Sequence, residues 1–166
     1  MLVLTFALLA LVPAAPGASC LLPPVAAPVA DPYREPACTW CPGNRGLTYA
    51  TQPGDVVRAA SAGAVTFSGT VAGTRYVVVD HGDGLRATYG GLAGTTLGTG
   101  DMVAAGEAVG RTTGDLHFGL RRGDDYIDPA PLLGRLVERP RLIPTDGTPP
   151  RPAPAPRLRC PVVRAR

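Results

Sequence analysis

The middle of the chain is predicted to fold as an all-β domain, a compact pair of sheets. Between residues 50 and 128, β-branched and aromatic residues form short runs, and Gly-rich turns separate these runs at regular intervals. No segment in this region longer than about nine residues has the periodicity of a helix. The chain has 166 residues, which is enough for one domain with a hydrophobic core and additional tails.

The strands expected in this region follow one another closely along the chain. The strongest is 75–81, because its valines are consecutive and β-branched, so we place it centrally in the sheet. Gly82-Asp83-Gly84 then predicts a hairpin turn. A short helix is expected at 129–137, and extended polyproline or disorder from Pro140. The predicted strands are 56–60, 64–69, 75–81, 85–89, 102–104, 108–109, 114–120 and 126–128.

Residues 1–19 are predicted to be a secretory signal peptide, because a short apolar run is followed by small residues and proline. A lipoprotein site at Cys20 is the less favoured alternative, since the usual leucine three residues earlier is missing. Residues 20–37 form a Pro-rich lead-in, 38–137 the folded domain, and 138–166 a Pro- and Arg-rich tail. We therefore expect a secreted, extracytoplasmic protein of the cell envelope.

The net charge of +3 is unevenly distributed along the chain. All sixteen basic residues are arginine, and seven of them lie between Arg139 and Arg166, where Asp146 is the one acidic residue. The tail therefore carries about +6 and the rest of the chain about −3. Such a tail suits contact with a membrane or with an anionic wall polymer, or serves as a solvated end. We do not predict a nucleic-acid partner.

The four cysteines predict two disulfides in an exported protein, although three pairings are open. We favour Cys38–Cys41, which would close a tight loop around Trp40, and Cys20–Cys160, which would tie the two ends of the chain together. Alternatively, the Cys-x-x-Cys sequence is a redox pair or half of a zinc site. A second such motif and a thioredoxin-like βαβ pattern are both missing from the sequence.

The predicted strand at 114–120 contains one of only two histidines in the chain. Because side chains alternate along a strand, Asp115 and His117 lie on the same face. Such a pair can ligate a metal or transfer protons. The other histidine, His81, follows a strand end and is expected to have a structural or capping role.

Several short motifs occur in a specific order between about residues 28 and 133. Their order and spacing resemble the LytM/lysostaphin-type zinc metallopeptidases, which cleave peptide cross-links in bacterial cell walls. The resemblance implies a compact antiparallel β core with an open groove. The motifs are Asn44-Arg-Gly-Leu-Thr48, Pro53-Gly-Asp-Val-Val-Arg-Ala-Ala60, Gly63-Ala-Val-Thr-Phe-Ser-Gly69, Asp80-His-Gly-Asp-Gly-Leu85, Thr88-Tyr-Gly-Gly-Leu92, Gly100-Asp-Met-Val-Ala-Ala-Gly-Glu-Ala-Val-Gly110 and Leu116-His-Phe-Gly-Leu120.

The resemblance also implies that most functional residues of the family have been replaced. The family binds zinc through an H-x-x-x-D motif, here Asn44 and Thr48, and through the last histidine of an H-x-H motif, here His117. The first histidine of H-x-H, an acid–base residue, corresponds to Asp115, and a further groove histidine corresponds to Gly91. A neutral amide and a neutral hydroxyl do not replace imidazole and carboxylate as zinc ligands. We expect a degenerate member with no cofactor, or with zinc if it is active.

Three functions follow from this comparison. The first is a non-catalytic pseudoenzyme that binds peptidoglycan peptides or regulates a cell-wall hydrolase. The second is an active zinc metalloendopeptidase with relocated ligands, drawn from Cys38, Cys41, Asp115 and His117. The third is a structural, wall-associated adaptor. A covalent lipoyl or biotinyl carrier is excluded, because the chain has no lysine to accept the group.

Overall fold

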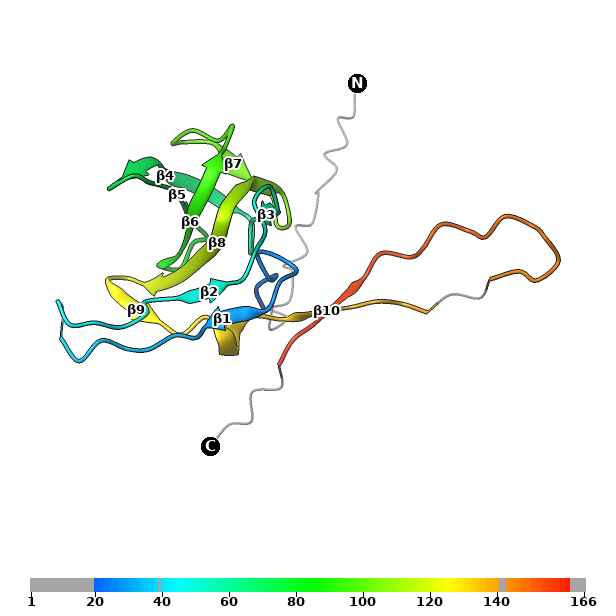
Figure 1. The fold of residues 1–166 in the computed structure, drawn as a ribbon, viewed down its shortest axis with the longest axis horizontal. Coiled ribbons are helices and arrows are strands. Elements are labelled where there is room, and N and C mark those ends of the chain that lie inside the picture. Colours follow the sequence, from blue (N-terminus) through cyan, green and yellow to red (C-terminus); the bar gives the residue numbers. More distant parts are fainter. Residues whose placement is uncertain (1–19, 39, 141–142, 162–166) are drawn as a thin grey trace, which may run out of the picture.

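The computed structural model describes residues 20–38, 40–140 and 143–161, so the predicted signal peptide lies outside the described residues (Figure 1). It is almost entirely β-structure, and the helical element in the described part is a 3-10 turn, η1, at Ala130–Leu132. No helix in the described ranges is long and apolar enough to cross a membrane. The strands are β1 Val29–Asp31, β2 Leu47–Tyr49, β3 Val56–Arg58, β4 Gly63–Val71, β5 Thr74–Asp80, β6 Leu85–Gly94, β7 Met102–Val103, β8 Ala108–Arg122, β9 Asp125–Ile127, β10 Arg135–Val137 and β11 Arg157–Arg159.

Strand β8 is the centre of a nine-stranded sheet with the order β1-β2-β8-β6-β5-β4-β7, in which β3 and β9 also pair with β8. Every described strand pairing is antiparallel, so the predicted all-β, antiparallel class is confirmed. The sheet pair that we expected is instead one continuous, curved sheet (Figure 1). The predicted central strand 75–81 and the strand 85–89 that follows its hairpin turn are also confirmed, since β5 and β6 pair from Arg75 to Asp80.

The prediction of two separate strands at 108–109 and 114–120 is wrong, because both belong to the single strand β8. The glycines between them suggested a turn, but Gly110 lies inside the strand. A Cβ atom there would stand 2.6 Å from the carbonyl oxygen of Gly94 on β6. The glycine therefore marks a close approach of two strands and not a turn.

The hydrophobic core lies on one face of the curved sheet. Leu116, Phe118 and Leu120 of β8 are completely buried, and alternation sends the residues between them to the opposite face. The Phe118 ring packs on Tyr89 at a centroid distance of 5.4 Å. The Tyr89 hydroxyl accepts a hydrogen bond of 2.8 Å from the amide of Ala60, so its polar group is satisfied inside the core.

The C-terminal prediction was wrong in two respects. The expected helix at 129–137 consists of the short turn η1 followed by strand β10. The tail is not a simple extended end, because Arg157–Arg159 returns as β11 and pairs with β10. β11 lies about twenty residues after β10 in the chain, so the local sequence around β10 does not reveal the strand with which it pairs. The described residues between the two strands, 138–140 and 143–156, project from the domain as a long arm (Figure 1).

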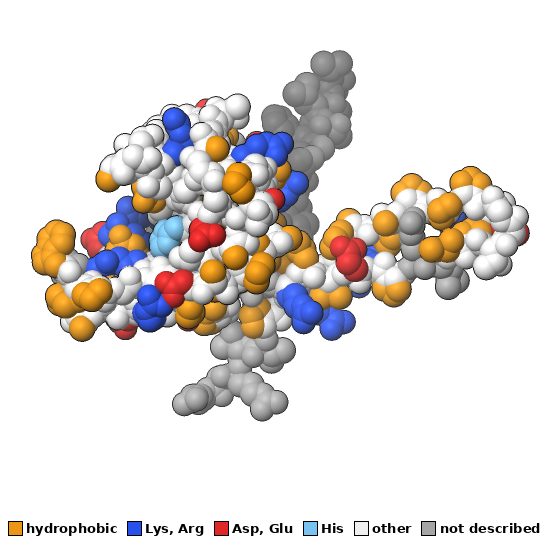
Figure 2. Space-filling model, viewed as in Figure 1, with side chains coloured by type: hydrophobic (Ala, Val, Ile, Leu, Met, Phe, Trp, Pro, Cys, Tyr) orange, Lys and Arg blue, Asp and Glu red, His pale blue; other side chains and the backbone are white. Residues whose placement is uncertain are grey.

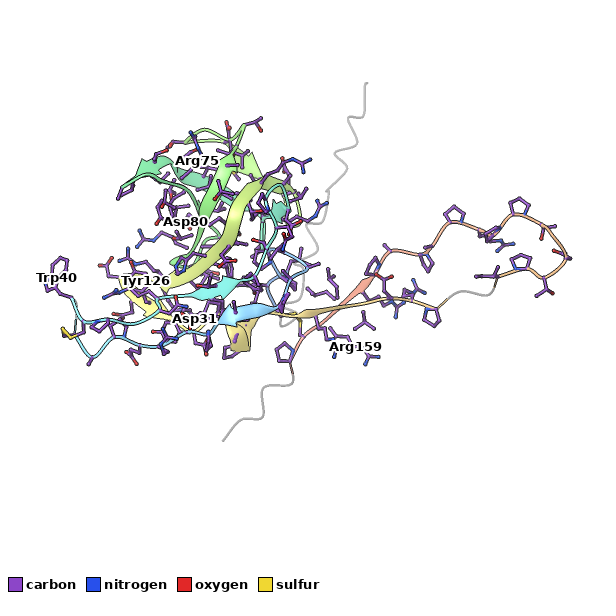
Figure 3. All side chains as sticks on the ribbon, viewed as in Figure 1. Asp31, Trp40, Arg75, Asp80, Tyr126 and Arg159 are labelled. Carbon is purple, nitrogen blue, oxygen red and sulfur yellow. A yellow bond between two sulfur atoms is a disulfide. The ribbon has the colours of Figure 1, made fainter. Side chains whose placement is uncertain are left out.

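The structure contains two disulfides, and they are the two pairs that we favoured from the sequence. Cys20–Cys160 joins residues 140 positions apart at the base of the β10–β11 ribbon. Cys38–Cys41 closes the tip of a second projection, which connects β1 to β2. The Trp40 side chain beside it is 94 % exposed (Figure 3).

Candidate functional site

Asn44, Thr48 and His117 come together where β2 meets β8. Thr48 is the register partner of His117, so their side chains share one face of the sheet. The Asn44 amide nitrogen lies 3.4 Å from the Thr48 hydroxyl oxygen. The three positions that the family resemblance assigns to zinc ligands are therefore adjacent in this structure.

The Asn44 side chain is held by acceptors that fix its orientation. It is only 7 % exposed, and its amide nitrogen donates to the carbonyl oxygens of Asp31 and Pro32 and to the Asp31 carboxylate, at 3.1–3.2 Å. Since all of these partners accept, the group facing them is the NH2 end of the amide. That nitrogen has no lone pair for a metal.

His117 is the one good zinc ligand of the three. Burial lowers the pKa of its ring, so the neutral imidazole is favoured. One imidazole with a threonine hydroxyl and an amide NH2 group does not match the three protein ligands of catalytic zinc sites. The residues present do not fit the zinc ion that the family uses, and we derive no chemical step through it.

Asp115 and His117 share a face of β8, as their spacing predicted, and both border the same pocket. Among the described residues, Asp115 and His117 nevertheless form no ion pair with each other. The two side chains thus do not form a coupled acid–base pair.

Gly91 stands at a bulge in β6, where the register with β8 shifts between Gly90 and Leu92. Its φ of 86° lies in the left-handed region, and a Cβ atom would come within 2.5 Å of the Asp115 carbonyl oxygen. A side chain at this position therefore needs the backbone to move. The position that the resemblance assigns to a groove histidine has lost the room for one.

Two pockets of about 320 and 350 Å³ meet at Tyr76 and His117, and together we call them the groove. Arg75 and Asp115 line the first pocket, which places both signs of charge at that end. Tyr126 lines the second pocket. On the surface, the view in Figure 2 shows a histidine between acidic and basic side chains over this part of the sheet.

The residues that shape the groove were not singled out from the sequence. Tyr76 covers Gly90, where a Cβ atom would lie 2.4 Å from the tyrosine ring. Tyr126 is flanked by the guanidinium groups of Arg45 and Arg121, at 5.7 and 5.0 Å from its ring centroid. An aromatic residue on the less buried face of the central strand β5 could have indicated the role of Tyr76 in the groove. The sequence contains no comparable indication for Tyr126, because Arg45, one of the two arginines beside its ring, comes from a distant segment of the chain.

The structure contradicts a relocated metal site that uses Cys38 and Cys41 as ligands. Cys38 and Cys41 are bonded to each other at the tip of a projection, so neither offers a thiolate. Within the described ranges, no group of three or more His, Cys, Asp or Glu side chains is arranged to hold a metal ion.

His81 lies apart from the groove. Its Nδ1 atom is 2.9 Å from the Ala62 carbonyl oxygen, whereas Nε2 is buried without a partner in the described structure. Burial lowers the pKa of His81, and this effect exceeds the opposing effects of that hydrogen bond and of Asp80. The ring links the ends of β4 and β5, and this contact supports the structural role that we expected.

Comparison with known proteins places the fold and the family. The model of peptidase family M23 matches residues 42–129, which is more than half of the chain. The uncharacterized protein Rv2891 of Mycobacterium tuberculosis is 32 % identical over 123 residues, covering 65 % of this chain and 48 % of the relative. This chain therefore spans about half the length of the curated relatives it matches.

Solved structures agree with the family match. Csd3 of Helicobacter pylori superimposes with a TM-score of 0.62 and 28 % identity, over 69 % of this chain and 33 % of that one. A chain of the SpoIIQ–SpoIIIAH pore-forming complex gives a TM-score of 0.62 at 18 % identity, over 70 % and 92 % of the two chains. The second likeness shows the fold alone. The chain belongs to peptidase family M23, the LytM/lysostaphin type.

Proposed function

We propose that this protein is a non-catalytic member of family M23 in the cell envelope, whose groove binds peptides. The observation that carries the proposal is the donor set of Asn44, Thr48 and His117. An amide NH2 group occupies a position that must supply a lone pair, and its partners hold it there. With neither a suited zinc site nor a coupled acid–base pair, hydrolysis of an amide has no evident source of activated water.

The groove retains the properties of a peptide-binding surface. It is open, it lies on a rigid antiparallel sheet, and it offers aromatic faces at Tyr76 and Tyr126. Arg75 and Asp115 at one end suit a ligand that carries both a carboxylate and an amine. Peptidoglycan peptides have this chemistry, and so does an extended segment of a partner such as a cell-wall hydrolase.

Secretion is part of the same proposal. It is supported by the predicted signal peptide and by two disulfides, which persist in oxidising compartments. A solved relative by fold comes from a complex of two proteins, which supports a role through protein partners.

Titration calorimetry tests this proposal by measuring how purified soluble muropeptides bind to the full chain. The metal content of the same protein sample is measured in parallel. We expect saturable binding, no stoichiometric zinc and no released products. Y76A should weaken the binding about tenfold, whereas R122Q, at the far end of β8, should leave it unchanged. Zinc bound at one equivalent and lost in H117A, together with cleavage of the muropeptides, would establish the enzyme instead.

A further inference from the structure

The segment between β1 and β2 projects from the sheet, and Trp40 stands at its tip (Figure 3). Arg34 and Asn44 close the base of this projection, because the amide of each donates a hydrogen bond to the carbonyl oxygen of the other, at 2.9 and 3.0 Å. We call residues 34–44 the Trp40 hairpin. At the tip, the Cys38–Cys41 disulfide and a 3.1 Å hydrogen bond between the same two backbones fix the turn. The hairpin therefore presents Trp40 on a backbone that is held at both ends.

The indole of Trp40 has almost no contact with the rest of the described structure, since the residue is 94 % exposed. Tryptophan side chains are highly buried on average, and they are enriched among the residues that dominate binding energies. Because the backbone that carries this ring is already ordered, a ligand that covers it costs little conformational entropy. The tip of the hairpin thus has the properties of a contact surface.

The base of the Trp40 hairpin borders the groove. Gly43 lines the second pocket together with Tyr126, and the guanidinium groups of Arg45 and Arg121 flank the Tyr126 ring. In the view of Figure 3, Tyr126 lies between Trp40 and the central strands. Trp40 precedes Arg45 by five residues, so the backbone separates the two by at most about 18 Å. A ligand that extends past Tyr126 on this side of the groove would reach the indole.

The charges near the tip do not suit a membrane surface. Residues 36–38 and 40–44 of the hairpin are uncharged. The first charged residue before this stretch is Glu35, which is exposed, and the first one after it is Arg45. An interfacial membrane site combines apolar area with cations that face anionic headgroups, whereas these two charges are opposite in sign. A polar ligand with a flat apolar face fits the tip better.

We propose that Trp40 stacks on a sugar ring of a glycan whose attached peptide lies in the groove. This inference rests on the proposed function, because the groove places the peptide. One face of a pyranose ring presents C–H groups that pack on an aromatic ring, while its hydroxyl groups stay in water or form hydrogen bonds. Arg45 and Arg121 beside Tyr126 offer donors for hydroxyl and carbonyl oxygens. The ligand is then a saccharide joined to a peptide, and not the peptide alone.

Fluorescence tests this inference directly, because Trp40 is the only tryptophan in the chain. The full chain is titrated with a disaccharide muropeptide, with the same peptide after removal of its sugars, and with phosphatidylglycerol vesicles. We expect the Trp40 emission to change with the muropeptide and to stay the same with the other two probes. In titration calorimetry, the muropeptide should bind at least about fivefold more tightly than the sugar-free peptide.

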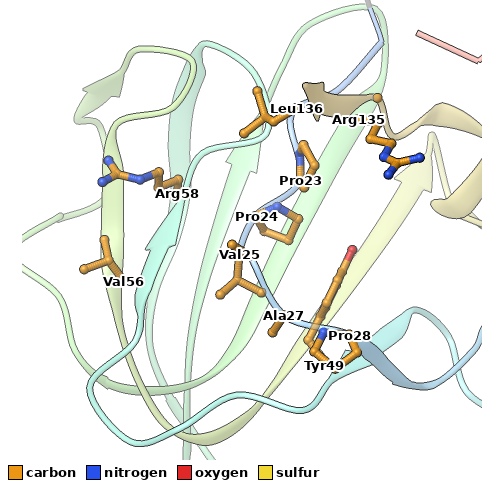
Figure 4. Close-up of a pocket in the computed structure, with 12 residues that line it drawn as sticks. Pro23, Pro24, Val25, Ala27, Pro28, Tyr49, Val56, Arg58, Arg135 and Leu136 are labelled. Carbon is orange, nitrogen blue, oxygen red and sulfur yellow. The ribbon is translucent and has the colours of Figure 1, made fainter. Parts of the chain in front are cut away.

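Two variants remove an exposed apolar side chain from different places. W40A should abolish the advantage of the muropeptide and leave the affinity for the sugar-free peptide unchanged, whereas W40Y, which keeps an aromatic face, should keep part of the advantage. L136A is the matched control and should change neither affinity. Leu136 is 49 % exposed and lines an apolar cleft of about 540 Å³ beside the Pro-rich lead-in, which shares no lining residue with the groove (Figure 4).

Equal affinities for the muropeptide and the sugar-free peptide, or unchanged Trp40 emission at saturating muropeptide, would overturn this inference and leave peptide binding in the groove intact. An emission change with the vesicles but not with the muropeptide would also overturn it, and would assign the tip to a membrane. A muropeptide that binds through Trp40, beside a sugar-free peptide that does not bind, would instead refute the groove proposal and leave the saccharide contact. Binding of neither probe would overturn both.

Discussion

Replacing Asn44 with histidine and Thr48 with aspartate is expected to give this protein a zinc site. The two substitutions restore a His, Asp and His set with the existing His117. Zinc–nitrogen and zinc–oxygen bonds of about 2.0–2.1 Å place the ligands of a tetrahedral site roughly 3.3 Å apart. The Asn44 nitrogen and the Thr48 oxygen are already 3.4 Å apart, and Thr48 pairs with His117.

The metal-free variant should be less stable than the wild type. The Asn44 NH2 group shares its two protons among two carbonyl oxygens and the Asp31 carboxylate, so its loss removes about two hydrogen bonds of about 1 kcal/mol each, roughly 2 kcal/mol in all. Zinc at one hundred times its dissociation constant would return about 2.7 kcal/mol. The free energy of unfolding should therefore drop in N44H/T48D with chelator and return to about the wild-type value with zinc.

Denaturant unfolding with and without zinc, combined with metal analysis, measures both quantities. The matched control adds H117A to the double variant and should abolish the zinc response, and wild type should show none. A folded N44H/T48D that takes up no zinc, or a triple variant that still does, would refute the convergence of these three positions. We do not expect full peptidase activity, since the backbone at Gly91 leaves no room for the remaining groove histidine.

Three further predictions concern stability. Burial lowers the pKa of both His81 and His117, so the unfolded chain binds protons more readily than the folded protein. The free energy of unfolding should therefore be highest above a pH of about 6.5 and should fall as the pH drops. Unfolding curves of H117N at several pH values should show a weaker pH dependence than those of the wild type. C20S/C160S should lower the free energy of unfolding by up to about 5 kcal/mol, because the disulfide closes a loop of 140 residues. An unchanged midpoint in denaturant would show that this disulfide does not stabilise the fold. G91A should cost about 1–3 kcal/mol, because its φ is positive and its Cβ meets backbone, whereas G54A, with a similar φ and open space, should cost less; equal effects would contradict a steric cause.

The central strands were predictable from the sequence because their signals are local. The valines of β5 and the hairpin glycines after it lie next to one another in the chain, and alternation along β8 correctly placed Asp115 and His117 on one face. The family could also be recognised from short motifs in order. Chemical identity alone was enough to doubt the zinc site, since an amide and a hydroxyl are poor ligands wherever they lie.

The tertiary structure decided whatever depends on pairing between distant segments. The direction of the Asn44 amide follows from acceptors on Asp31 and Pro32, and the bulge at Gly91 follows from the approach of β8. The tail forms a two-stranded ribbon because β11 pairs with β10, and the Cys20–Cys160 disulfide joins the ribbon to the N-terminal segment. Residue types and local periodicity determined the class and the strands, whereas contacts across the sheet determined which chemistry the groove has kept.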